Sequence, residues 1–215
     1  MGLNSINIIC FFTTLPVIAG FISWQYLSQN LQLFVIRFIL VAFTEVLANK
    51  IKYYNAQIFN LFMVVDFFLL IAVAYNLFPN KIRTFYFAIC TFLFLSTWIV
   101  SIIMTSVADF SVYAYVVFCI IMVFTYFIGL VHLFFGKSYN ENKIMIFICA
   151  ITMIYYCSVI PLFSFLPYIL KNLIGFKASK IYNINYCLTD VWYLLITISF
   201  LCSRRRYNSQ LWKGI

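Results

Sequence analysis

The chain has 215 residues, of which 66% are hydrophobic and only 9% are charged, and its formal net charge is +9. A soluble domain carries about a quarter of its residues as charged side chains, so this composition excludes a water-soluble globule. Disorder is excluded too, because aromatic residues make up 21% of the chain and disordered segments are poor in them. The sequence predicts an all-α polytopic membrane protein.

The number of membrane spans follows from the length of the apolar runs. A helix needs roughly 20 apolar residues to cross a hydrocarbon core of about 30 Å. Seven runs of about this length occupy residues 6–25, 31–49, 56–77, 84–106, 112–135, 144–168 and 184–202. The first run is not expected to be a cleaved signal peptide, because residues 1–7 contain no Lys or Arg. We expect a seven-transmembrane-helix bundle within residues 1–203 and a short basic cytosolic tail at 204–215.

The distribution of Lys and Arg predicts the orientation, because cytoplasmic loops are enriched in both. With the amino terminus outside, the inner loops and the tail contain eight of these residues and the outer loops contain five. The triplet Arg204, Arg205 and Arg206 supplies most of the difference. We expect a bacterial inner (plasma) membrane, with the N-terminus out and the C-terminus in. The triplet can then contact anionic lipid or a protein partner, and the net charge needs no nucleic acid to explain it.

A comparison of the third and seventh runs suggests an internal repeat. Shifting the sequence by 125 residues superposes Asn60 on Asn185, and shifting it by 124 superposes Asp66 on Asp190. No single shift gives both matches, so a weak internal duplication is one alternative and chance similarity is the other. A true repeat predicts a 3+1+3 arrangement with the fourth helix as a linker. In span count and chain length the sequence is similar to the 3+1+3 transporters for sugars and vitamin precursors, but it contains none of their motifs.

Several ionisable residues fall inside the predicted spans, where a charge costs a few kcal/mol or more and is a functional candidate by default. These are Arg37, Glu45, Asp66, His132 and Asp190, and the amides of Asn60 and Asn185 lie in the same spans. Arg37 and Glu45 are about 80° apart around their helix, so a direct contact between them is not expected. A carboxylate from another helix, Asp66 or Asp190, is a better partner for Arg37.

Two interpretations of these polar residues stay open. In the first, they form a polar site for transport through the bundle. In the second, they tie helices together as satisfied interhelical pairs. Pro161 and Pro167 in the sixth run predict a helix kink, whose freed carbonyl groups could line a cavity.

Missing residue types exclude several classes of seven-span protein. Retinal proteins need a lysine in the last helix, and residues 184–202 contain none. Seven-span zinc hydrolases need several histidines, and this chain has one. The seven cysteines form no CxxC pair, so we predict no metal site and no cofactor.

Two functions fit the sequence about equally. The first is a small-solute or ion transporter or channel that uses the intramembrane carboxylates, since such groups can bind and release a proton or a cation. The second is a non-enzymatic sensor, anchor or pore-forming effector subunit that acts with a protein partner or as a homo-oligomer, since no catalytic motif is present. A lipid-modifying enzyme is the less favoured alternative.

Overall fold

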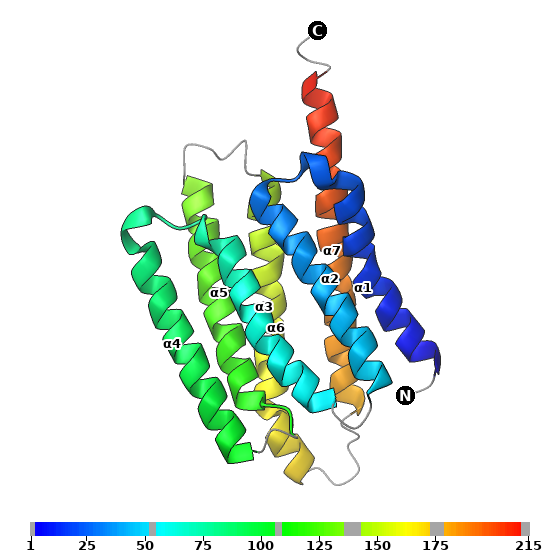
Figure 1. The fold of residues 1–215 in the computed structure, drawn as a ribbon, viewed down its shortest axis with the longest axis vertical. Helices are drawn as coiled ribbons and strands as arrows, with labels where there is room; N and C mark the ends of the chain where they lie inside the picture. The colour runs from blue at the N-terminus through cyan, green and yellow to red at the C-terminus, as the bar shows by residue number, and fades with distance from the viewer. Residues whose placement is uncertain (1–2, 52–54, 106–108, 136–142, 173–178, 212–215) are drawn as a thin grey trace.

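The computed structural model describes residues 3–51, 55–105, 109–135, 143–172 and 179–211. Within these residues the chain forms seven α-helices and one short 3-10 helix, and no strand (Figure 1). The α-helices are α1 (Leu3–Ser23), α2 (Gln29–Lys50), α3 (Asn55–Tyr75), α4 (Asn80–Thr105), α5 (Val112–Phe135), α6 (Lys143–Asn172) and α7 (Ser179–Leu211), and the 3-10 helix η1 (Trp24–Tyr26) follows α1.

Six of these helices are long and apolar enough to cross a membrane. In the described residues, α2 to α7 each contain an apolar segment of 20 to 25 residues, which matches the roughly 20 residues that a bilayer requires. The chain is therefore an integral membrane protein, and the predicted all-α, seven-helix architecture is confirmed. The side chains of residues 3–10 lie outside the described part, so α1 is shown as a helix and its membrane span stays a prediction.

Six helices form a closed ring in the described part of the chain. α1 packs against α2 and α7, α2 against α3, α3 against α5, α5 against α6, and α6 against α7. Consecutive helices run in opposite directions, so the odd-numbered helices share one direction (Figure 1). α4 lies outside the ring, where it contacts α3 and α5.

α4 is the most peripheral of the apolar helices. Only 22% of its span is buried inside the protein, against 33–44% for the other five spans. Its Phe94 ring stacks on Phe67 of α3 with centroids 4.1 Å apart, and Trp98 Nε1 donates to the carbonyl of Asn60 at 3.1 Å. This position fits the linker of a 3+1+3 arrangement, since three helices before α4 and three after it enclose the interior. The internal duplication itself stays a prediction.

The ends of two helices differ from those expected from hydropathy. α7 begins at Ser179 and continues to Leu211, so it includes most of the expected tail. α6 continues to Asn172 and is not interrupted at Pro161 or Pro167. Hydropathy marks only the part of a helix that lies in hydrocarbon, whereas the backbone hydrogen bonds that define a helix can continue into water. Pro161 is exposed, and the predicted kink stays a prediction.

Gly20 allows α1 and α2 to approach closely. A Cβ atom at position 20 would overlap both Cγ atoms of Val35 on α2. Val35 is fully buried, and its β-branched side chain has little freedom to turn away. Gly129 on α5 is less crowded, because an added Cβ would lie 3.3 Å from the end of the more flexible Leu77 side chain.

We expect Gly20→Ala to destabilise the protein by about 1–3 kcal/mol, the usual cost of overpacking a well-packed interior, and Gly129→Ala to cost less. Free energies of unfolding in detergent micelles measure both effects. Val35→Ala removes the overlapping atoms, so it should restore most of the stability that Gly20→Ala loses. Equal losses for the two glycine variants, or no rescue by Val35→Ala, would show that this contact does not limit the packing of α1 on α2.

Candidate functional site

The ring of helices encloses a cavity of about 700 Å³. Its wall is formed by side chains from α1, α2, α3, α5, α6 and α7, together with Phe110, and its described lining residues include none from α4. Ligand sites of proteins commonly have volumes of about 300–1,000 Å³. The cavity is therefore large enough for a small organic molecule.

The cavity opens at one end of the bundle and is closed at the other. Asn55, the first residue of α3, and Asn183 of α7 line it and are exposed, so they mark the mouth. Phe118 and Tyr156 line the inner end and are each 1% exposed. The mouth therefore lies where α2 ends and α3 and α7 begin, which is also the end at which α1 begins (Figure 1).

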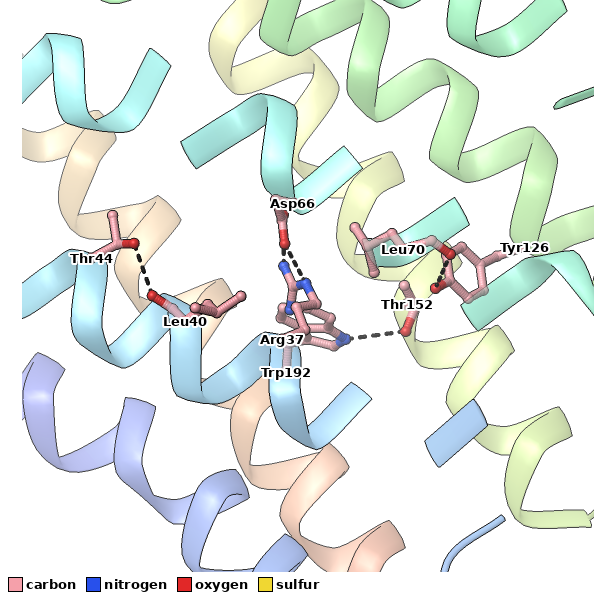
Figure 2. A network of polar contacts seen from close by, with 8 residues as sticks. All are labelled: Arg37, Leu40, Thr44, Asp66, Leu70, Tyr126, Thr152 and Trp192. Atoms are coloured by element: carbon pink, nitrogen blue, oxygen red, sulfur yellow. Dashed lines mark hydrogen bonds and ion pairs between the residues drawn. The ribbon is translucent and has the colours of Figure 1, made fainter. Parts of the chain in front are cut away.

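A buried ion pair between α2 and α3 lies at the inner end of the cavity. Arg37 Nε donates to Asp66 Oδ1 at 2.5 Å, and Arg37 Nη2 donates to Asp66 Oδ2 at 2.9 Å. Figure 2 shows this two-point contact, in which the guanidinium fork faces the carboxylate. Both residues line the cavity, yet they are only 4% and 7% exposed. Paired hydrogen bonds between charged groups are the strongest type available in a protein, and they fix α2 relative to α3.

Aromatic rings surround the Arg37 guanidinium on its remaining sides. Its central carbon lies 4.9 Å from the ring centroid of Trp192, 5.2 Å from that of Phe38 and 5.8 Å from that of Phe34. Within the described residues Nη1 is buried and has no hydrogen-bond acceptor. The faces of the rings provide the negative potential there, since a cation within about 6 Å of an aromatic centroid is attracted to it.

Trp192 is itself held firmly by α6. Its ring stacks on Tyr155 with centroids 4.5 Å apart and an interplanar angle of 5°. Its Nε1 donates to Thr152 Oγ1 at 3.4 Å (Figure 2). The ion pair of α2 and α3 is thereby connected to α6 and α7 through one indole ring.

A layer of fully buried side chains separates the ion pair from the far end of the bundle. Phe34, Leu70, Ile196, Phe200 and Tyr126 have 0% exposure. The Tyr126 hydroxyl donates to the carbonyl of Leu70 at 3.5 Å, which joins α5 to α3 (Figure 2). Phe34, Leu70 and Ile196 lie about one helical turn beyond Arg37, Asp66 and Trp192 on the side opposite the mouth. The cavity therefore reaches only part of the way through the protein.

Two further carboxylates line the cavity and are partly exposed. Glu45 lies on α2, about 12 Å along the helix axis from Arg37, because each residue of a helix rises about 1.5 Å. Asp190 lies on α7, two residues before Trp192. Neither carboxylate makes a hydrogen bond or an ion pair with another residue that the structure describes. They differ in this respect from Asp66, whose charge is neutralised by Arg37.

The structure brings together five of the seven polar residues expected in the bundle interior. Arg37, Glu45, Asp66, Asn185 and Asp190 all line this cavity. Of the two acids considered as partners for Arg37, Asp66 forms the pair. The Oδ1 atom of Asn185 is buried and has no donor among the described residues.

Asn60 and His132 lie elsewhere. Asn60 Nδ2 donates to the carbonyl of Asp109 at 2.9 Å, and its Oδ1 accepts from the backbone N–H of Ser111 at 3.0 Å. Asn60 therefore fixes the segment that leads into α5. His132 is exposed in the last turn of α5, near the opposite end of the bundle. The side chains of Arg204, Arg205 and Arg206 lie outside the described residues.

Sequence reasoning missed the aromatic residues of the site. The cavity wall includes six aromatic residues that were not among the candidates from the sequence: Tyr115, Phe118, Tyr155, Tyr156, Trp192 and Tyr193. Adjacent aromatic pairs at 155–156 and 192–193 are visible in the sequence. With 42 Phe and Tyr residues spread over every span, however, no periodicity separates those that line the cavity from those that face the acyl chains.

Metal and disulfide chemistry have no support in the described residues. There, no group of three or more His, Cys, Asp or Glu side chains lies close enough to hold a metal ion. Six described cysteines, including the buried Cys90, Cys119 and Cys149, are free thiols. The site is therefore an arrangement of charges, amides and aromatic rings.

No protein-family model, no curated protein and no solved structure matches this chain. Its function therefore has to be argued from the cavity and from the charges that line it.

We expect Arg37→Met and Asp66→Leu each to cost about 3–5 kcal/mol, because each leaves an unpaired charge in a buried site. The double variant contains neither charge and should recover much of that loss. Free energies of unfolding in a double-mutant cycle measure the coupling. Asp109→Asn removes an exposed carboxylate and is the matched control. If the losses of the two single variants simply add in the double variant, the two side chains do not interact in the folded protein.

Proposed function

We propose that this protein moves a small solute across the membrane and that the half-open cavity is its binding site. The observation that supports this most directly is a cavity of about 700 Å³ that runs from one end of the bundle to a buried ion pair near its middle. Intramembrane charges and polar groups around a central cavity are typical of substrate pathways in transporters.

The closed end of the cavity determines which side of the membrane the binding site faces in this state. If the amino terminus is outside, as the Lys and Arg distribution predicts, the mouth faces the exterior. The ion pair and the buried layer around Phe34, Leu70 and Phe200 then block the path to the interior. Alternating access requires this layer to separate while the mouth closes, and relative rocking of α1–α3 and α5–α7 is the simplest motion that achieves both.

The charged residues have different roles in this proposal. The charges of Arg37 and Asp66 neutralise each other, and the pair lies at the closed end of the cavity. Glu45 and Asp190 lie along the accessible part of the path without partners among the described residues. These two carboxylates are therefore the groups that meet the solute first.

A solute sensor is the second candidate. It would use the same cavity for binding without moving the solute. The observation that favours it is the length of α7, which continues to Leu211 and projects beyond the other helices at the end opposite the mouth (Figure 1). Such a projection is suited to contact a protein partner. Binding without flux distinguishes this candidate from a transporter.

We expect Met63→Trp to abolish solute flux, because Met63 lines the cavity and an indole there fills part of the path. The assay uses proteoliposomes loaded with a mixture of amines, amino acids, sugars, nucleosides and carboxylic acids. Mass spectrometry then measures which solutes are lost relative to protein-free liposomes. Leu61→Trp is the matched control, because Leu61 lies two residues away on α3 and is 66% exposed toward lipid.

A second blocking variant distinguishes a blocked cavity from a misfolded protein. Ala56→Trp narrows the cavity near its mouth, where Ala56 is only half-buried and an added ring can be accommodated. Both blocking variants should keep a cooperative thermal unfolding transition. Transport is contradicted if the unmodified protein depletes no solute from the mixture, or if properly folded Met63→Trp and Ala56→Trp proteins deplete the same solute at an unchanged rate.

A further inference from the structure

We infer that the ligand of the cavity is a small organic cation: a protonated amine attached to an apolar or aromatic body. Its movement across the membrane rests on the proposed function, whereas its binding rests on the charges and rings of the cavity alone. Three features of the cavity wall favour such a ligand: its net charge, the hydrogen-bonding character of its free groups, and its aromatic surface.

The first feature is the charge of the lining. The described lining contains one cation, Arg37, and the carboxylates of Glu45, Asp66 and Asp190. Arg37 and Asp66 neutralise each other. Two carboxylates remain, and a solute that brings positive charge to them replaces the cation that the described lining does not supply.

The guanidinium of Arg37 is not arranged as an anion site. Two of its nitrogen atoms donate to Asp66, and the third is buried beside aromatic rings and lies within a residue that is only 4% exposed. An anionic ligand would have to displace Asp66 or lie beside it. Repulsion from that carboxylate and from Asp190 opposes such binding.

The second feature is that the unsatisfied groups nearer the mouth are hydrogen-bond acceptors. Glu45 and Asp190 offer carboxylate oxygens, and Asn185 offers a buried Oδ1 without a donor in the described chain. An ammonium group has three N–H donors and no acceptor, so it complements this set. A hydroxyl or carbonyl solute can satisfy fewer of these oxygens.

The third feature is the aromatic wall. Tyr115 and Phe163 meet edge to face with centroids 4.8 Å apart, and Phe110 lies 6.2 Å from Phe163. Trp192 and Tyr155, which also line the cavity, form a stacked pair. Such rings bury an apolar body and also attract a cation through their faces. A bare metal ion or a sugar would leave most of this surface without a complementary contact.

The carboxylates lie at two depths. Glu45 is about 12 Å along α2 from Arg37, whereas Asp190 is only about 3 Å along α7 from Trp192, which touches Arg37. Both carboxylates therefore lie along the path between the mouth and the ion pair. The apolar body of an amine can lie against the aromatic wall beside them.

A matched set of ligands tests the charge preference. The set is phenylpropylamine, phenylpropanol and phenylpropanoate, which share a ring and a linker and differ in the charge of the head group, with phenylbutylamine as a longer amine. Isothermal titration calorimetry measures their binding to the full-length protein in lipid nanodiscs, and empty nanodiscs provide the blank for partitioning into lipid. We expect saturable binding of the amines with a Kd at least about tenfold below that of the alcohol, and no saturable binding of the phenylpropanoate.

Neutral isosteres test the two carboxylates. Glu45→Gln and Asp190→Asn should each raise the Kd of phenylpropylamine by about fivefold to tenfold, and leave the Kd of phenylpropanol unchanged. Asp109→Asn removes the same charge at an exposed position outside the cavity and should leave both values unchanged. A loss of binding that is equal for amine and alcohol would indicate a distorted cavity and would contradict a direct charge contact.

The outcomes separate the ligand class from transport. The inference of an organic cation is contradicted if the amines bind no better than the alcohol, or if phenylpropanoate binds as well as the amines. Flux of a neutral or anionic solute in the proteoliposome assay also overturns it while transport stands. Saturable amine binding that depends on Glu45 and Asp190, without flux of any solute, supports the ligand class and contradicts transport.

Discussion

The cost of charge in hydrocarbon determines the interior of this protein. An arginine near the middle of a membrane helix is stable only if a partner neutralises it and accepts its hydrogen bonds. Asp66 provides both through two short contacts to Arg37, and Trp192 covers the guanidinium from α7. One ion pair and one ring thereby connect three helices, and through the Thr152 and Tyr155 contacts of Trp192 a fourth. The arrangement of the six ring helices around the cavity depends on this cluster of side chains.

The same cluster divides the protein into an accessible half and a closed half. On one side lie partly exposed carboxylates and a polar mouth, and on the other lie side chains with no solvent exposure, such as Phe34 and Phe200. α4 contributes nothing to the described lining, so the cavity is formed by the six ring helices together with Phe110. The small organic cation that we propose as the ligand would complement both the acceptor oxygens and the aromatic faces.

The sequence predicts the helical class and the candidate polar residues because both follow from single-residue costs: apolar length for a span, and the rarity of charge within it. It does not determine which acid pairs with Arg37, since helical angles relate residues on one helix and carry no information on the rotation of its neighbours. The roles of Asn60 and His132 depend on those rotations as well, and they differ from the expectation of a shared polar interior. The aromatic wall was missed for a related reason, because lipid and an apolar cavity favour the same side chains.

Cysteine accessibility in sealed, oriented vesicles most directly tests whether a cavity open to one side ends at the Arg37–Asp66 pair. In a background from which the seven native cysteines have been removed, Phe62→Cys and Thr189→Cys report on the cavity, and Leu70→Cys and Ile196→Cys report on the buried layer beyond the pair. A membrane-impermeant thiol reagent added on the mouth side is expected to label the first two positions and to leave the second two unlabelled. Labelling of the buried layer from the mouth side, or no labelling of either cavity position from the mouth side, would contradict the proposed cavity.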